Sequence, residues 1–201
     1  MLGALDAGAH GILVPLLNTV EEAKNLVLSA KFPPQGHRGF GSPFPMGRFH
    51  HTLGSDDYLK QSNDALLTMV QIETKDGLDN VDDIAAVPGI DVLFVGPFDL
   101  GNNIGQPVLN GVIHESLHSA IARVLKAAKA AGKKAGIFCT SGEQAKFYAD
   151  QKFDMISVAT DMFVLPMGVM SSLCVFTDSV FYALRFRMRC LHTVMYLPHL
   201  P

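Results

Sequence analysis

The chain has few cysteines and no long run of charges of one sign. Its three cysteines, Cys139, Cys174 and Cys190, are scattered without the Cys-x-x-Cys spacing of zinc sites. This pattern argues against a disulfide framework and against a zinc site, and it favours a reducing compartment. The net charge is −3 at pH 7 without a basic stripe, so we expect no nucleic-acid partner.

The sequence also lacks the features of a secretory signal. The segment from Met1 to Asp6 has neither a basic start nor a long apolar stretch, so we expect a cytoplasmic protein. One apolar run, 162–186, ends among arginines in the manner of a membrane anchor. Because Asp178 inside this run makes insertion costly, and because 162–173 also suits a final barrel helix, we do not expect a membrane protein.

The length and composition are those of a single folded domain. The chain has 201 residues, of which 48% are hydrophobic and 17% are charged. A chain of this size can bury a substantial core, and this composition is not that of a disordered protein.

Strands and helices alternate along the chain. Thr19 and Glu22 form a Thr-x-x-Glu capping box that predicts a helix to about residue 31. A long Gly/Pro-rich loop is expected over 35–54, before the second strand. We expect five strands, at 11–17, 66–73, 91–95, 134–139 and 155–159, and further helices at 2–9, 56–65, 76–86, 111–132 and 141–152.

This alternation predicts an α/β fold with a parallel sheet and right-handed crossovers. Five strands are too few for an eight-stranded barrel. The pattern can therefore supply only part of a barrel. We expect an incomplete (β/α)8 TIM barrel of about five β/α units, and an open sheet is the alternative. We expect the barrel domain to span 1–174 and an atypical tail to span 175–201.

Two acidic residues follow two adjacent strand-like runs. Glu73 ends the run Val70-Gln71-Ile72-Glu73, and Asp99 follows the run that begins at Val92. Because the carboxyl ends of barrel strands face the active site, these carboxylates are expected to meet at the barrel mouth. Two carboxylates without a nearby cysteine or histidine suit a hard divalent cation. The alternative is that each is a loop-facing charge or a helix cap.

Several motifs resemble one known family. They are Ala4-Leu5-Asp6-Ala7-Gly8-Ala9-His10-Gly11-Ile12, Gln35-Gly36-His37-Arg38-Gly39-Phe40-Gly41, Val70-Gln71-Ile72-Glu73, Val95-Gly96-Pro97-Phe98-Asp99-Leu100 and Ser157-Val158-Ala159-Thr160-Asp161. Together they resemble the class II pyruvate aldolases of the HpcH/HpaI type, over about residues 4–165. These enzymes cleave 4-hydroxy-2-oxo acids to pyruvate and an aldehyde.

The resemblance implies a site and a cofactor. It implies that Glu73 and Asp99 bind a divalent metal ion, which is Mg²⁺, Mn²⁺ or Co²⁺. Gln71, two residues before Glu73, points the same way along a strand and is a candidate for substrate binding. The turn Gly96-Pro97-Phe98-Asp99 is expected to hold the pyruvate carboxylate through the amides of Phe98 and Asp99. Arg38 is a further candidate for an anion contact or a subunit contact, in a loop expected near the barrel mouth.

The chain departs from the family pattern at both ends. The amino-terminal third of the family, with its catalytic histidine and its substrate-binding arginine, has no counterpart here, so the catalytic base is left unassigned. The tail over 175–201 does not match the usual last helix, and we expect it to be disordered or an artefact of the gene model. We expect a homo-oligomer acting on a small 2-oxo acid. The alternatives are an inactive fragment that keeps a metal half-site and an acyl-CoA lyase of the citrate lyase β-subunit type.

Overall fold

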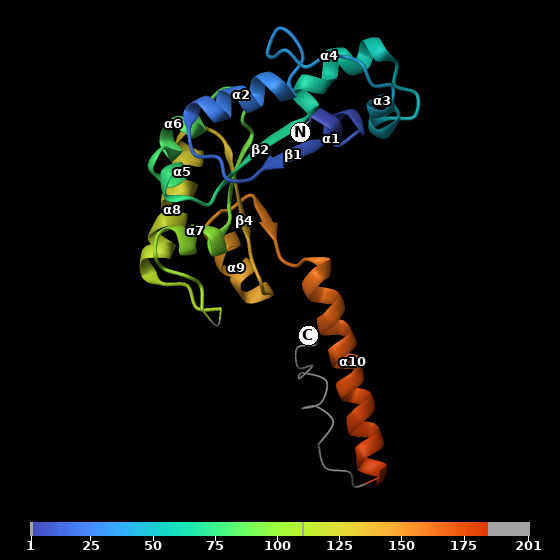
Figure 1. The fold of residues 1–201 in the computed structure, drawn as a ribbon, viewed down its shortest axis with the longest axis vertical. Coiled ribbons are helices and arrows are strands. Elements are labelled where there is room, and N and C mark those ends of the chain that lie inside the picture. Colours follow the sequence, from blue (N-terminus) through green and yellow to red (C-terminus); the bar gives the residue numbers. More distant parts are fainter. Residues whose placement is uncertain (1, 110, 185–201) are drawn as a thin grey trace, which may run out of the picture. The chain divides into compact units, whose positions relative to one another are not determined.

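The computed structural model describes residues 2–109 and 111–184, which divide into two units, 1–158 and 159–201 (Figure 1). The strands of the first unit are β1 (Gly11–Val14), β2 (Leu67–Ile72), β3 (Val92–Val95), β4 (Lys134–Phe138) and β5 (Met155–Ser157). Its helices are α1 (Leu2–Asp6), α2 (Val20–Ala30), α3 (Phe44–Phe49), α4 (Ser55–Ala65), α5 (Lys75–Asp79), α6 (Val81–Ala86), α7 (Pro97–Asn103), α8 (Glu115–Ala130) and α9 (Gly142–Asp150).

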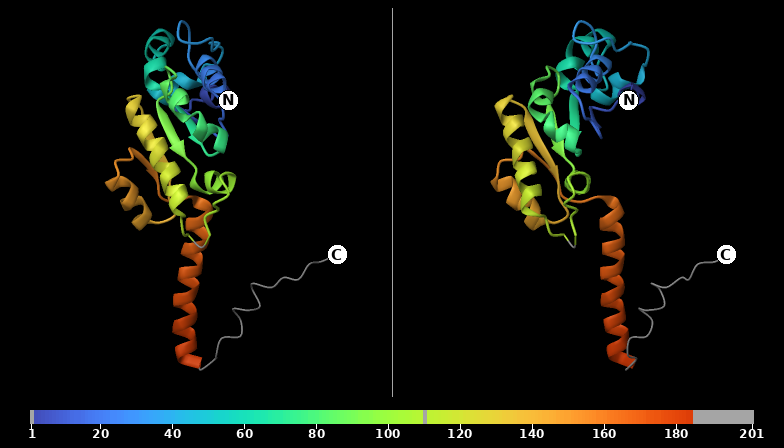
Figure 2. Two further views of the ribbon diagram at one scale, coloured as in Figure 1. Left: turned by 90° about the vertical axis from the view of Figure 1, so that its left-hand side faces the viewer. Right: turned by 60° about the vertical axis from the view of Figure 1, so that its left-hand side comes forward.

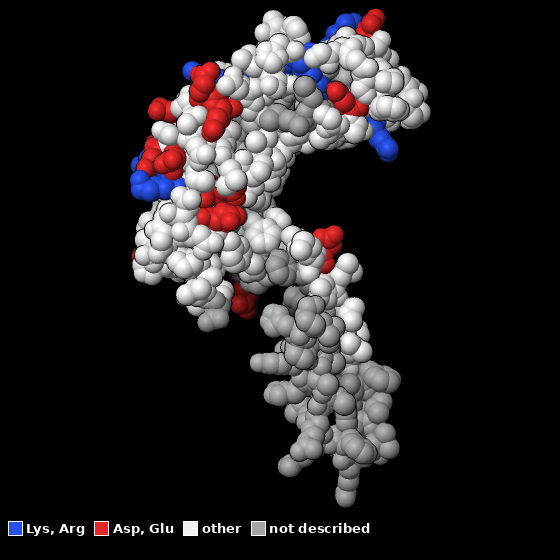
Figure 3. Space-filling model, in the orientation of Figure 1, with Lys and Arg blue, Asp and Glu red and all other residues white. Residues whose placement is uncertain are grey.

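The strands form one parallel sheet in the order β1-β2-β3-β4-β5. The sheet curls, as part of a barrel wall does, and helices lie on its outer face (Figure 1). In the same orientation, Figure 3 shows charged side chains gathered over the outer helices at the left of the view. The view in Figure 2 shows α8 running alongside the strands. The prediction of an incomplete β/α barrel is therefore confirmed, and all five predicted strands are present within a few residues of their expected bounds.

Local capping explains where several helices begin. The capping box of α2 is formed as predicted, because Thr19 Oγ1 accepts from the Glu22 amide and the Glu22 carboxylate accepts from the Thr19 amide. Thr74 and Ser141 cap α5 and α9 through their hydroxyl oxygens. Each of these caps lies just after a strand, so the helix starts are tied to the carboxyl end of the sheet.

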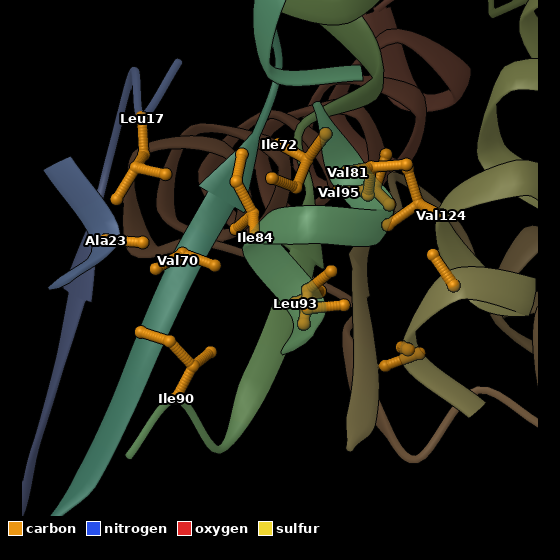
Figure 4. Packing of buried hydrophobic residues seen from close by; sticks show 14 of the residues in the cluster. Leu17, Ala23, Val70, Ile72, Val81, Ile84, Ile90, Leu93, Val95 and Val124 are labelled. Carbon is orange, nitrogen blue, oxygen red and sulfur yellow. The ribbon is translucent and has the colours of Figure 1, made fainter. Parts of the chain in front are cut away.

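The core lies between the sheet and its outer helices (Figure 4). Val70, Ile72, Leu93 and Val95 alternate along β2 and β3, and each is fully buried against the helices. Ile84 from α6 is also fully buried there. Burial of a leucine- or isoleucine-sized side chain contributes roughly 1.5–3 kcal/mol, so this layer contributes substantially to the stability of the unit.

Three local features differ from the sequence-based expectations. The Gly/Pro-rich loop contains the short helix α3, and the segment from Gly96 to Asp99 is the start of helix α7 and not a simple turn. The helix expected over 76–86 is broken at Asn80 into α5 and α6. These are short helices of five to seven residues, which carry little periodicity for a sequence pattern to detect.

The second unit contains one helix, α10 (Asp161–Leu184), within the described residues. The helix continues without interruption through residue 174, the boundary predicted between the barrel domain and the tail. Residues 185–201 of the predicted tail lie outside the described part. In the ranges 2–109 and 111–184, no helix combines the length and apolarity that are needed to cross a membrane.

Candidate functional site

Glu73 is a buried carboxylate directly after the end of β2. The residue is 2% exposed. Its Oε1 accepts the Leu16 amide at 2.8 Å, and its Oε2 accepts from Gln71 Nε2. Gln71 therefore points to the same side of the strand as Glu73, as the two-residue spacing predicts. The two hydrogen bonds fix the carboxylate at the carboxyl end of the sheet.

The surroundings of Glu73 disfavour a negative charge. Burial raises the pKa of Glu73, the Leu16 amide opposes this shift, and the charge of Asp99 raises the pKa further. Among the residues that the structure describes, no lysine or arginine forms an ion pair with Glu73 or Asp99. Within the described residues, the candidate site is thus a pair of carboxylates without an ion-paired lysine or arginine.

Asp99 lies in the first turn of α7, which follows β3. Since Ile72 of β2 pairs with Val95 of β3, the segments carrying Glu73 and Asp99 leave the sheet side by side. Asp99 is exposed, whereas Glu73 is buried. The two carboxylates that the sequence predicted to converge are brought to the same edge of the sheet, one from a strand end and the other from a helix.

Gly96, between β3 and α7, lies against the carboxylate. A Cβ atom at this position would lie 2.7 Å from both Gln71 Nε2 and Glu73 Oε2. Only a residue without a side chain leaves these atoms where they are. Pro97 follows at the first position of α7, where the absence of an amide hydrogen costs nothing. Phe98 is 40% exposed in the same turn.

Arg38 lies at the opposite end of the strands from Glu73. Its Nη2 donates to Asp6 Oδ1 at 2.9 Å, and its amide donates to the Lys31 carbonyl. Lys31 in turn donates to the carbonyl of Leu66, the residue immediately before β2. The loop was expected near the barrel mouth, but the structure places Arg38 near the amino end of β2 as a buried ion-pair partner.

The contribution of Leu16 to the candidate site was not predicted from the sequence. Its amide is a hydrogen-bond donor to Glu73, and its backbone has a φ of 55°. A leucine carries no sequence signal for such a conformation, since this region of φ favours glycine. The described residues contain no cluster of three or more His, Cys, Asp or Glu side chains suited to a metal ion. The candidate metal ligands are therefore limited to the two carboxylates of Glu73 and Asp99.

The fold and the site define a parallel β/α barrel segment with paired carboxylates at the carboxyl ends of its strands. Residues 1–166 match the model of the HpcH/HpaI aldolase/citrate lyase family. The chain therefore belongs to this family, as the motifs predicted.

Named relatives and solved structures agree with this assignment. The chain is 36% identical over 168 residues to a hydroxypyruvate/pyruvate aldolase of Chromohalobacter salexigens, with 84% of this chain and 65% of that protein covered. It is 35% identical over 164 residues to a 4-hydroxy-2-oxo-heptane-1,7-dioate aldolase of Salmonella newport, with coverages of 82% and 61%. The structure of an HpcH/HpaI aldolase/citrate lyase family protein from Burkholderia cenocepacia matches with a TM-score of 0.75 and 35% identity, over 87% of this chain and 68% of that one. The chain thus spans less than two thirds of the length of these two aldolases.

Proposed function

We propose that this chain carries the metal- and pyruvate-binding part of an aldolase site. The reaction is cleavage of a 4-hydroxy-2-oxo acid to pyruvate and an aldehyde. The observation that carries the proposal is the buried Glu73 carboxylate beside Asp99, held by two hydrogen bonds and without an ion-pair partner among the described residues.

The residues present fit a divalent cation. Glu73 and Asp99 offer carboxylate oxygens, which are the ligands that Mg²⁺ and Mn²⁺ prefer, and Co²⁺ is also compatible. Burial and mutual repulsion disfavour two negative charges here, and a cation relieves both costs. When bound, the cation would supply positive charge opposite the negative charge that develops on the 2-oxo group.

The neighbouring groups would orient the substrate. Gln71 donates its amide hydrogen to Glu73 and so fixes the direction of the carboxylate. The amides of Phe98 and Asp99 lie in the first turn of α7, where backbone N–H groups have no partner within the helix. They are therefore available to bind the pyruvate carboxylate beside Gly96 and Pro97. No described residue is assigned as the catalytic base.

We also propose that the chain self-associates. In the described part of the chain, β1 pairs with β2 on one side and leaves its other edge open. Leu13 on β1 is 40% exposed and Leu67 on β2 is 42% exposed. An open strand edge with apolar neighbours favours pairing with another chain, which light scattering after size-exclusion chromatography would detect as a mass above 21.7 kDa.

Exchange of deuterium into the methyl group of pyruvate tests the proposed activity. The exchange requires enolisation, which is common to pyruvate aldolases, so the assay needs no assumption about the aldehyde. Proton NMR would follow the methyl signal in D₂O with and without Mn²⁺. The variants are Glu73→Gln and Asp99→Asn. Asp83→Asn on α6 is the matched control, because Asp83 is an exposed aspartate that forms no ion pair within the described residues.

The expected result is Mn²⁺-dependent exchange that is lost in Glu73→Gln and Asp99→Asn and kept in Asp83→Asn. Metal-dependent exchange that survives both site variants would refute the assignment of the ligands. A folded chain that binds Mn²⁺ but catalyses no exchange would refute the catalytic part and favour the alternative of an inactive half-site.

An acyl-CoA lyase of the citrate lyase β-subunit type is the less supported alternative. The relatives named above, at 35% and 36% identity, are aldolases. Cleavage of an acyl-CoA ester, measured with a thiol reagent, would favour this alternative if pyruvate exchange were absent.

A further inference from the structure

The backbone of Leu16 is strained at the point where it contacts the proposed site. Its φ of 55° lies in the left-handed region, which is unfavourable for a leucine. The side chain is 60% exposed, so its burial does not offset this cost. The conformation directs the Leu16 amide at Glu73 Oε1, at 2.8 Å. A strained residue that persists must be held by its surroundings.

Asn18 keeps the Leu16 backbone in this conformation, because each polar group of Asn18 is hydrogen-bonded. Its Nδ2 donates to the Leu16 carbonyl at 3.0 Å, and its Oδ1 accepts from Thr74 Oγ1. Its carbonyl accepts from Asn80 Nδ2 at 2.9 Å, and its amide donates to Glu22 Oε2 at 2.7 Å. Asn18 therefore joins the loop after β1 to the cap of α5 and to the segment between α5 and α6.

This arrangement ties Leu16 to the residue that follows Glu73. Thr74 is the next residue along the chain after Glu73 and the N-cap of α5. Asn18 bonds both Thr74 and the Leu16 carbonyl, so the donor amide and the acceptor carboxylate are held by the same side chain. A change at Asn18 frees Leu16 to leave the strained conformation and to withdraw its amide.

We propose that Asn18 is a positioning residue, which holds the Leu16 amide against Glu73 and so prearranges the carboxylate to bind a divalent cation. The inference rests on the proposed function and deepens it. Residues that orient a metal ligand through hydrogen bonds, without contacting the metal themselves, typically lower the metal affinity by roughly 10- to 100-fold when they are mutated. A merely structural role for Asn18 would instead change stability and leave the affinity of the folded chain unaltered.

Titration of the full chain with Mn²⁺, followed by the electron paramagnetic resonance signal of the free ion, tests this inference. The main variant is Asn18→Asp, which has the same shape and keeps the acceptor for Thr74 but lacks the donor to the Leu16 carbonyl. Asn18→Ala is the second variant. Asn25→Ala is the matched control, since Asn25 is an exposed asparagine on α2 with no side-chain hydrogen bond recorded among the described residues. Circular dichroism would establish that each variant is folded.

We expect the Kd for Mn²⁺ to rise by about tenfold or more in both Asn18 variants and to stay unchanged in Asn25→Ala. The added negative charge of Asn18→Asp would by itself strengthen binding, so a loss in this variant identifies the lost donor as the cause. Leu16→Gly keeps the amide and tolerates the left-handed backbone, so its Kd should stay within about threefold of the parent.

Unchanged Mn²⁺ affinity in the folded Asn18 variants, with binding lost in Glu73→Gln, would overturn the role of Asn18 and leave the proposed function standing. Tenfold weaker binding in Leu16→Gly would also overturn it, because the side chain and not the amide would then be responsible. Undiminished binding in Glu73→Gln would overturn the proposed metal site itself, and this inference with it.

Discussion

Replacement of Gly96 by alanine tests the close packing of the site directly. The added Cβ would lie 2.7 Å from Gln71 Nε2 and Glu73 Oε2, and 3.2 Å from Glu73 Cβ. Contacts of this length are not tolerated, so the carboxylate or the amide must move. The backbone itself accepts alanine, because Gly96 has a φ of −99° and a ψ of 90°. The perturbation is therefore confined to the side chains of the site.

The structure predicts a small effect on stability and a large effect on the site. Overpacking costs about 1–3 kcal/mol, and the low end applies because the nearest atoms are the ends of flexible side chains. Alanine lowers the entropy of the unfolded chain, which offsets about 0.4–1 kcal/mol of this cost. We expect a net loss of about 0.6 kcal/mol or less in the free energy of unfolding. The displaced Glu73 carboxylate should weaken Mn²⁺ binding by about tenfold.

Urea unfolding and Mn²⁺ titration of the same sample measure the two effects. Gly39→Ala is the matched control, since a Cβ there has no atom within 4 Å. It should leave both quantities nearly unchanged. Wild-type Mn²⁺ affinity in folded Gly96→Ala would refute the reasoning, because it would show that the carboxylate position at this contact does not matter for binding. A stability loss well above 3 kcal/mol would show that the backbone and not the side chains had moved.

Three further predictions concern the stability and reactivity of the first unit. Leu93→Ala, in the fully buried centre of β3, should lower the free energy of unfolding by about 2–5 kcal/mol in urea, and a loss below 1 kcal/mol would contradict the packing described. Partial burial opposes ionisation of Asp154, but hydrogen bonds from Lys129, the Ala135 amide and Lys134 prevail and lower its pKa to about 2. Its folded pKa lies below the unfolded value of 3.8, so its contribution to stability is present above that pH and is lost as the pH falls towards 2. Asp154→Asn should therefore lower the free energy of unfolding by about 1 kcal/mol at pH 7 and by progressively less between pH 4 and 2, as followed by thermal unfolding. An equal loss at pH 7 and at pH 2 would contradict the ion pairing. Burial raises the pKa of Cys139 to about 11, so iodoacetamide at pH 8 should modify the Cys139 peptide on unfolding and not in the native chain, as read by mass spectrometry.

Much of the fold could be predicted because it rests on local signals. The run that became β3 is short and continuously apolar, as strands buried in a parallel sheet are, and the run that became β2 is short and rich in apolar residues. The capping box at Thr19 and Glu22 is a contact between near neighbours, so its residues alone indicate where α2 begins. The order of these elements was enough to predict parallel strands with crossover helices and to place Glu73 and Asp99 at one edge of the sheet.

The sequence was less informative where the structure departs from regular periodicity. The helix α7 places Asp99 one turn beyond the strand end, and seven residues are too few to show a helical pattern. Arg38 was expected near the barrel mouth because of its motif, yet the ion pair with Asp6 holds it at the amino end of the strands. A motif identifies such a residue but does not indicate which end of the sheet its loop reaches.

The sequence by itself determined the class of fold and the family, and it predicted the two acidic residues of the proposed site, since these depend on residue types and on their spacing along the chain. The tertiary structure alone decided how Glu73 is held. Its carboxylate accepts the amide of Leu16 across 57 positions, from a leucine in a conformation that its own side chain disfavours. Gly96, from a third segment, leaves the space that the carboxylate occupies. Contacts between residues so distant in sequence arise from packing of the sheet, and no local pattern records them.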